Sequence, residues 1–381
     1  MTRVLVTGAR APVALDLARS FRAAGCDVAL ADSVRPFAAS LSRPRFEILR
    51  LPPPRREFDR FRARLGAVAG RYDLIVPTCE EVFWLAAAAE RDGWADRLFA
   101  PSTISLRILH SKVSFPALAR EAGVEAPATW TLASAADAGL IPLAPADLVL
   151  KPEFSRFGSE TIVGPQPGVA EALPASPTRR WVAQERVEGE EYCVWSAIRG
   201  GELVACIVYR PTLRHARSAA YAFEAVDSPA LVEMARRIAR HVGGDGQLSY
   251  DAIVRPNGRV APIECNPRTV SGVHLLDGSP ALANALLGRG ELAPPAAGTL
   301  RYLSPAMALM GAPAALAGGG FGPVRTAWRK GRDSVGRPGD RLPVAGVLLD
   351  AARFALMGAA RLRGPTSETT DDIEWNGEAF E

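Results

Sequence analysis

Hydrophobic and polar positions in the first hundred residues alternate between short apolar runs and longer patterns of helical period. Residues 3–7 read as a strand, residues 13–24 as a helix and residues 27–31 as a second strand. This order predicts a compact α/β unit. The turn after the first strand keeps only Gly8, whereas a dinucleotide-binding turn needs the spacing GxGxxG. We therefore do not expect a nicotinamide dinucleotide in this unit.

Two further apolar strands are predicted in the second half of the chain, at residues 248–254 and 259–264, joined by a Pro-Asn-Gly turn. Asp251 lies in the first strand, Glu264 ends the second, and Asn266 follows two positions later. Because alternate residues of a strand share a face, the hairpin can bring these three side chains together. Oxygen ligands without thiol or imidazole suit Mg²⁺. The alternative is a surface hairpin whose acids are only solvated.

Two lysines precede this hairpin. Lys151 closes the apolar run at residues 147–152, and a lysine at a buried strand end needs an anionic partner such as phosphate. Lys112 lies in a segment that is predicted to be helical and to end at Gly123. Taken alone, Lys112 reads as a solvated helix charge.

Together, these residues resemble the ATP-grasp enzymes, and the Asn-Pro-Arg sequence at 266–268 is similar to the branch that includes carbamoyl phosphate synthetase. The resemblance covers roughly residues 111–276. It implies an α/β ATP-grasp fold with four parts: a Rossmann-like pre-ATP-grasp domain (1–105), a small ATP-binding lobe (106–180), a large lobe with the Mg²⁺ site (181–300) and a C-terminal extension (301–381).

The resemblance also implies a role for individual residues. Mg²⁺ is expected on Asp251, Glu264 and Asn266. ATP is expected to contact Lys112, Lys151, Ser155, Arg156, Gly158, Gln184, Glu185, Val187 and Glu191. In that set the backbone near Glu185 and Val187 would hold adenine and Glu191 the ribose, although the acids at 188–191 also fit a solvated hairpin tip.

The segment at residues 153–160 departs from the family, because it has one glycine where a glycine-rich phosphate loop is usual. Ser155, Gly158 and Ser159 can still cover phosphate, with Arg156 supplying a charged fork in place of backbone donors. An ordinary surface turn is equally consistent with this segment alone.

The residues expected to bind the substrate differ from those expected to contact ATP. Glu80 and Glu81 follow a buried strand at residues 74–76, where ligands of open α/β sheets bind, so they are expected to face an acceptor substrate. Alternatively, they only favour a helix N-terminus. The resemblance implies that Arg268 contacts the transferred phosphoryl group or the acyl phosphate, with Ser271 and Gly272 in the loop that follows. The alternative is that Arg268 only makes a structural ion pair.

A basic cluster is formed in sequence by Arg210, Arg214, His215 and Arg217. It either closes over phosphate or a substrate carboxylate, or it is a solvated loop. The residues expected to act in catalysis are therefore Arg268, Lys151 and Arg210.

Composition agrees with a multidomain enzyme. The chain has 381 residues, of which 48% are hydrophobic and 23% charged, and a formal charge of +4. Scattered arginines give no support to a nucleic-acid partner. Five cysteines without a CxxC pair, and a charged start followed directly by a strand, predict a cytoplasmic protein without a signal peptide.

The C-terminal extension is less readable. Residues 302–324 are uncharged, but prolines and a Gly-Gly-Gly run argue against a membrane span. Residues 344–363 form a predicted amphipathic helix that packs on the ATP lobes, makes a dimer contact or rests on a membrane, the last being the least favoured. The acidic tail at residues 368–381 carries Trp375, which we expect to be exposed.

The sequence thus predicts a Mg²⁺- and ATP-dependent ligase that activates a small-molecule carboxylate as an acyl phosphate and joins it to an amine. A homodimer is possible. The alternatives are an enzyme that forms carboxyphosphate, a non-catalytic ATP-binding regulator and a membrane-associated interaction protein.

Overall fold

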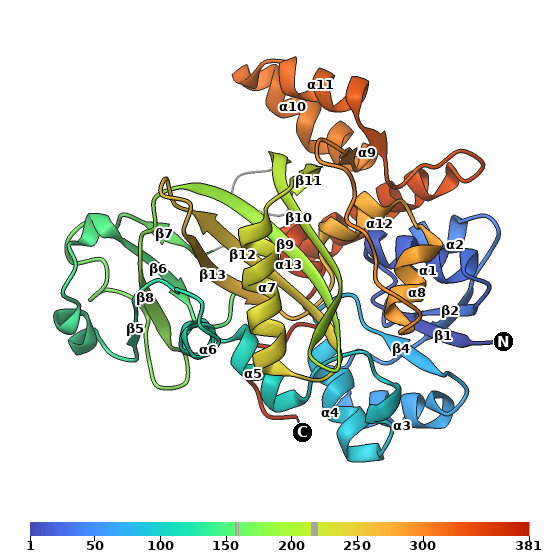
Figure 1. The fold of residues 1–381 in the computed structure, drawn as a ribbon, viewed down its shortest axis with the longest axis horizontal. Coiled ribbons are helices and arrows are strands. Elements are labelled where there is room, and N and C mark those ends of the chain that lie inside the picture. Colours follow the sequence, from blue (N-terminus) through green and yellow to red (C-terminus); the bar gives the residue numbers. More distant parts are fainter. Residues whose placement is uncertain (157, 159, 215–219, 381) are drawn as a thin grey trace.

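The computed structural model describes residues 1–156, 158, 160–214 and 220–380. The N-terminal domain holds a parallel sheet of order β3-β2-β1-β4 (Figure 1). Its strands are β1 (Arg3–Thr7), β2 (Asp27–Asp32), β3 (Glu47–Arg50) and β4 (Leu74–Val76). Its helices are α1 (Pro12–Ala23), α2 (Phe37–Leu41), α3 (Phe58–Ala69) and α4 (Val82–Asp92). The predicted α/β unit is confirmed.

The small lobe follows two short helices, α5 (Thr103–His110) and α6 (Phe115–Glu121). Its sheet has the order β5-β8-β6-β7. The strands are β5 (Thr129–Leu132), β6 (Leu148–Pro152), β7 (Ile162–Val163) and β8 (Trp181–Glu185). Strand β8 pairs with both β5 and β6, so it belongs to the sheet of the small lobe.

The large lobe is built on a seven-stranded sheet of order β13-β12-β9-β10-β11-β14-β15. Its strands are β9 (Glu190–Arg199), β10 (Glu202–Arg214), β11 (Ala220–Ala225), β12 (Gly246–Val254), β13 (Val260–Asn266), β14 (Leu300–Tyr302) and β15 (Arg332–Asp333). Helices α7 (Pro229–Val242) and α8 (Pro280–Leu286) pack on it. Val4 of β1 shares one core with Trp195 and Phe223, so the N-terminal domain and this lobe are joined by apolar packing.

The C-terminal extension contributes β14 and β15 to the large sheet and also carries four helical segments, three of them between these two strands. They are α9 (Ser304–Ala306), α10 (Ala312–Ala314), α11 (Gly322–Lys330) and α12 (Leu342–Ala360), with the short α13 (Pro365–Glu368) after them. A wider helical turn at Met307–Gly311 joins α9 to α10, and a second at Ala315–Gly319 follows α10 and is interrupted at Gly318. The run that we did not expect to span a membrane is therefore a broken helical segment.

Helix α12 packs on the N-terminal domain, which differs from the predicted contact with the ATP lobes. Gly346 lies against Ala38, where a Cβ atom would come within 2.5 Å of the Ala38 Cα. Asp350 accepts hydrogen bonds from the backbone N–H groups of Phe37 and Ala38 at 3.3 and 3.1 Å. These bonds satisfy free donors at the start of α2. Among the described residues, one helix is long and apolar enough to cross a membrane by length and composition alone, and that helix is α12.

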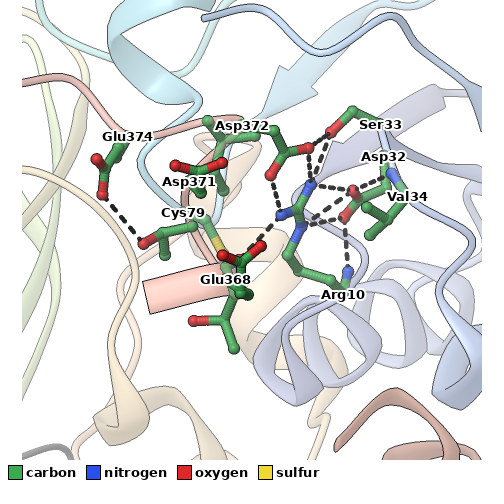
Figure 2. A network of polar contacts seen from close by, with 12 residues as sticks. Arg10, Asp32, Ser33, Val34, Cys79, Glu368, Asp371, Asp372 and Glu374 are labelled. Atoms are coloured by element: carbon green, nitrogen blue, oxygen red, sulfur yellow. Dashed lines mark hydrogen bonds and ion pairs between the residues drawn. The ribbon is translucent and has the colours of Figure 1, made fainter. Parts of the chain in front are cut away.

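The acidic tail folds back onto the N-terminal domain, and Trp375 is buried rather than exposed. Its ring stacks on Phe83 at a centroid distance of 4.8 Å and leaves only 1% of the residue accessible. Arg10 joins the tail to the end of β2, because its guanidinium lies 2.7 Å from Asp32 and 2.6 Å from Asp372 (Figure 2). The tail was expected to be exposed because it is acidic. In the structure its acids pair with arginines that are distant in sequence, which holds the tail against the N-terminal domain.

Replacing Trp375 with alanine should lower the free energy of unfolding by about 3–5 kcal/mol, since a large buried ring would leave a cavity. Chemical denaturation followed by circular dichroism measures this loss. The matched control is Trp328→Ala, because Trp328 is 62% exposed and its loss should change stability by no more than about 0.5 kcal/mol. Equal stability of both variants would contradict the docked tail.

Candidate functional site

A cavity of about 510 Å³ lies between the sheet of the small lobe and the sheet of the large lobe. Strands β6 and β8 supply one wall, and β9, β10, β12 and β13 supply the other. Its size is within the range that small-molecule and cofactor sites usually show. Most of the polar residues singled out from the sequence line this cavity.

The predicted hairpin brings the three oxygen-bearing residues together. Asp251 and Glu264 face each other as register partners in β12 and β13. The Asn266 amide donates to a Glu264 carboxylate oxygen at 3.2 Å, and the Cys193 thiol donates to Asp251 at 3.3 Å. Among the described residues no group of three His, Cys, Asp or Glu forms a metal cluster, so a cation here would need the amide oxygen of Asn266.

The charges of this group are arranged unevenly. Burial, and then the charge of Glu264, raises the pKa of Asp251 to about 7. Burial would also raise the pKa of Glu264, but Lys112 and Lys151 outweigh it, so the pKa of this carboxyl is lowered. Two close carboxylates cannot both ionise at little cost without added positive charge. A divalent cation would supply that charge, and the donor set is one that Mg²⁺ accepts.

Both predicted lysines are buried beside the cavity, and they are two of only three lysines in the sequence. The Lys112 ammonium lies 3.4 Å from Glu264 and donates to the Ser155 carbonyl at 3.2 Å. Lys151 donates to the Ile263 carbonyl at 3.1 Å, and burial followed by the charge of Lys112 lowers its pKa to about 8. Each lysine keeps donors for a further acceptor, which suits an anionic ligand.

One correction concerns the setting of Lys112. The residue lies in the turn between α5 and α6, because α6 begins only at Phe115. The end of that helix near Gly123 is as predicted, with Gly123 at φ 74°. The turn tucks the side chain inward instead of leaving it on a helix surface.

The predicted adenine and ribose residues also line the cavity. Gln184 and Glu185 end β8, Val187 lies in the connection that follows, and Glu191 lies at the start of β9. The Glu185 carboxylate accepts hydrogen bonds from the Ala128 N–H and from Arg255. The Glu185 side chain therefore fixes the connection between β8 and β9. Backbone groups there remain the candidates for contacts with a base.

The segment at residues 153–160 differs from the expected phosphate cover. Gly158 lines the cavity, but the Ser155 hydroxyl is buried and donates to the Pro152 carbonyl at 3.4 Å. Arg156 is turned away from the cavity: it pairs with Glu80 at 2.9 Å and donates to the Asn376 side chain at 2.9 Å. The buried carboxylate of Glu80 and the C-terminal tail take the donors of the Arg156 guanidinium, which explains why it does not face the cavity. Ser159 lies outside the described residues.

Glu80 and Glu81 do not face an open acceptor site together. Glu80 is enclosed between Arg268 and Arg156, and these two arginines hold its pKa well below the usual range despite burial. Glu81 accepts from the Thr7 hydroxyl at 2.7 Å and the Thr78 N–H at 3.1 Å. Glu81 therefore connects β1 to the turn before α4. Its position just before a helix had not distinguished a structural role from contact with a substrate.

The remaining predicted substrate residues divide into two groups. Arg268 and Ser271 line the cavity, and Arg268 is held by Glu80 at 2.7 Å. Gly272 is packed under Tyr209, where a Cβ would come within 2.7 Å of the ring. Arg210 is exposed and pairs with Glu224 at 2.9 Å, away from the cavity lining, so it is not placed for catalysis.

Within the basic cluster, Arg214 does line the cavity and grips Glu191 through two hydrogen bonds of 2.7 and 2.8 Å. His215 and Arg217 lie outside the described residues. Cys193 also lines the cavity, a position that was not predicted from the sequence. Its position two residues after Glu191 in a strand was a usable signal, because the two side chains share a face.

The structure thus has a cavity between two lobes and a separate N-terminal α/β domain. No protein-family model and no curated protein matches the chain. Solved structures do resemble it. The ADP complex of N5-carboxyaminoimidazole synthetase from Staphylococcus aureus matches with a TM-score of 0.64 at 12% identity, over 82% of this chain and 85% of the other.

Two ligases are also similar. Phosphoribosylamine–glycine ligase from Thermotoga maritima matches with a TM-score of 0.59 at 14% identity, over 78% of each chain. L-amino acid ligase from Bacillus licheniformis matches with a TM-score of 0.56 at 15% identity, over 75% of this chain and 74% of the other. The chain has the ATP-grasp fold, as the sequence predicted.

Lys151→Ala should weaken the binding of Mg²⁺-ATP by about 1.5–3 kcal/mol, because it removes a charge-assisted contact to phosphate. Isothermal titration calorimetry measures the change. Lys330→Ala is the matched control, since Lys330 is exposed on α11 and far along the chain from the cavity. Unchanged affinity in the Lys151 variant would assign this lysine to structure alone.

Proposed function

We propose that the protein is an ATP-dependent ligase that activates a carboxylate as an acyl phosphate and joins it to an amine, releasing ADP and phosphate. The observation that carries this proposal is the meeting of Lys151 with Asp251, Glu264 and Asn266 in one interlobe cavity. A second buried lysine, Lys112, lies behind this wall with its ammonium 3.4 Å from Glu264. Fixed positive charge beside a set of hard oxygen ligands suits a nucleoside triphosphate with its metal ion.

Individual residues then have separate tasks in the proposed reaction. Lys112 and Lys151 hold phosphate oxygens, and Glu191 with Arg214 borders the ribose end. Arg268 presents a guanidinium at the cavity wall, where it can orient the substrate carboxylate or the phosphoryl group. Asp251, Glu264 and Asn266 would hold Mg²⁺, which when bound neutralises phosphate charge during transfer.

The bond changes need no protein nucleophile. A carboxylate oxygen forms a bond to the γ-phosphorus while the bond from that phosphorus to the ADP oxygen breaks. The amine then attacks the acyl carbon, phosphate leaves with the electron pair of the acyl–oxygen bond, and the amine proton passes to solvent. Positioning and electrostatic stabilisation are the contributions left to the chain.

A second candidate is an enzyme that phosphorylates bicarbonate to carboxyphosphate. It is favoured by the similarity to structures named N5-carboxyaminoimidazole synthetase. Both candidates release ADP, so an ADP-release screen against paired carboxylic acids and amines, run with and without bicarbonate, separates them. Bicarbonate-dependent ADP release without a carboxylic acid would support the second candidate. ATP binding without ADP release under any condition would support a non-catalytic regulator.

Glu264→Gln should lower turnover at least about a hundredfold, because it removes a charge where phosphate charge is neutralised, while the fold is kept. Turnover is measured as ADP release, and folding is checked by thermal unfolding. Glu202→Gln is the matched control, since Glu202 is exposed at the start of β10 and pairs with Arg240 on the surface. A folded Glu264 variant with normal turnover would refute the metal assignment.

A further inference from the structure

The C-terminal extension carries most of the exposed apolar side chains of the protein. Among the described residues fourteen large hydrophobic side chains are exposed, and ten of them lie between residues 309 and 362. They are Leu309, Met310, Leu316, Phe321, Trp328, Leu342, Leu348, Leu349, Leu356 and Leu362. Single exposed apolar residues are ordinary, but a concentration of this kind marks an interaction surface.

Helix α12 contributes a continuous apolar stripe. Its inner face packs on α2, yet only 28% of its apolar stretch is buried. The outward positions recur every three or four residues and contain only leucine and alanine: Leu342, Ala345, Leu348, Leu349, Ala352, Ala355, Leu356, Ala359 and Ala360. The one acid of this helix, Asp350, is buried against α2.

A second exposed surface is formed by the arm, which we define as residues 303–332. Helices α10 and α11 of the arm project from the body at the top of Figure 1. One side of the arm packs on β11 through Met307, Val324 and Ala327, which leaves its other side chains outward. The base of the arm is fixed beside α12, because α9 contacts that helix.

The arm has a distinctive charge pattern. It contains no acid, and its four charged residues are Arg325, Arg329, Lys330 and Arg332. All four are exposed, and none of them forms an ion pair with any residue that the structure describes. Trp328 lies exposed among them on α11. Tryptophan and leucine beside unpaired basic residues is the pattern of a segment that rests in a lipid interface.

We propose that the arm and the outer face of α12 dock the protein on an anionic phospholipid surface. The exposed leucines and Trp328 would enter the headgroup region while the four basic residues contact lipid phosphates. Lipid is favoured over a second copy of the chain, because a second copy would bring the same positive charge to this surface whereas anionic headgroups complement it. In this arrangement α12 stays packed on α2, and no segment of the chain crosses the membrane.

The test is co-sedimentation of the full chain with vesicles of phosphatidylglycerol and phosphatidylcholine in equal parts, and with vesicles of phosphatidylcholine alone. The wild type should bind the anionic vesicles and not the neutral ones, and added salt should weaken binding. Replacing the four basic residues of the arm with glutamine should reduce partitioning at least about tenfold. Leu348→Ser with Leu356→Ser should do the same by removing apolar insertion.

The matched control replaces four exposed arginines of the N-terminal domain, Arg43, Arg45, Arg64 and Arg71, with glutamine. It changes the net charge equally and should leave vesicle binding intact. Thermal unfolding confirms that each variant is folded. The proposal is overturned if the wild type does not bind anionic vesicles, or if the control loses binding as much as the arm variant does.

Light scattering after size-exclusion chromatography tests the alternative that a second copy of the chain covers this surface. A monomeric wild type supports the proposal. A dimer that the Leu348→Ser, Leu356→Ser variant converts to a monomer would assign the stripe to a subunit interface and overturn the lipid assignment. None of these residues lines the interlobe cavity, so the outcome is independent of the proposed ligase activity.

Discussion

The buried carboxylate of Glu80 is the contact on which the arrangement of the parts depends. It comes from the N-terminal domain, just before α4, and it pairs with Arg268 of the large lobe at 2.7 Å and Arg156 of the small lobe at 2.9 Å. Arg156 in turn holds the C-terminal tail. Because a buried charge without partners is very costly, all four parts must be in place together.

This contact also shapes the cavity beside it. Arg268 is kept at the cavity wall by Glu80, Lys151 lines the cavity from the small-lobe side, and the Lys112 ammonium lies 3.4 Å from Glu264. An arginine-rich chain with three lysines has placed two of them here, where a compact ammonium can approach a phosphate oxygen. Lys112 and Lys151 lower the pKa of Glu264 despite its burial, whereas burial and the charge of Glu264 raise the pKa of Asp251.

The C-terminal extension divides into an inward and an outward part. The tail buries Trp375 and closes the network of Arg10, so it belongs to the core of the N-terminal domain. The arm and α12 expose leucine and unpaired basic residues instead. The same eighty residues therefore stabilise the body of the protein and provide the surface proposed to meet lipid.

The sequence by itself determined the features that arise from local pattern. Strand alternation placed Asp251, Glu264 and Asn266 on one hairpin, and the order of the lysines and the acids identified the ATP-grasp fold. Only the tertiary structure decided which partner each charge takes. Arg156 and Glu80 looked free for phosphate and substrate, and Trp375 looked exposed, because their partners lie far away in sequence: Asn376 is 220 residues from Arg156, and Phe83 is 292 residues from Trp375. Local spacing cannot report such pairs, since they form only when the separate parts pack.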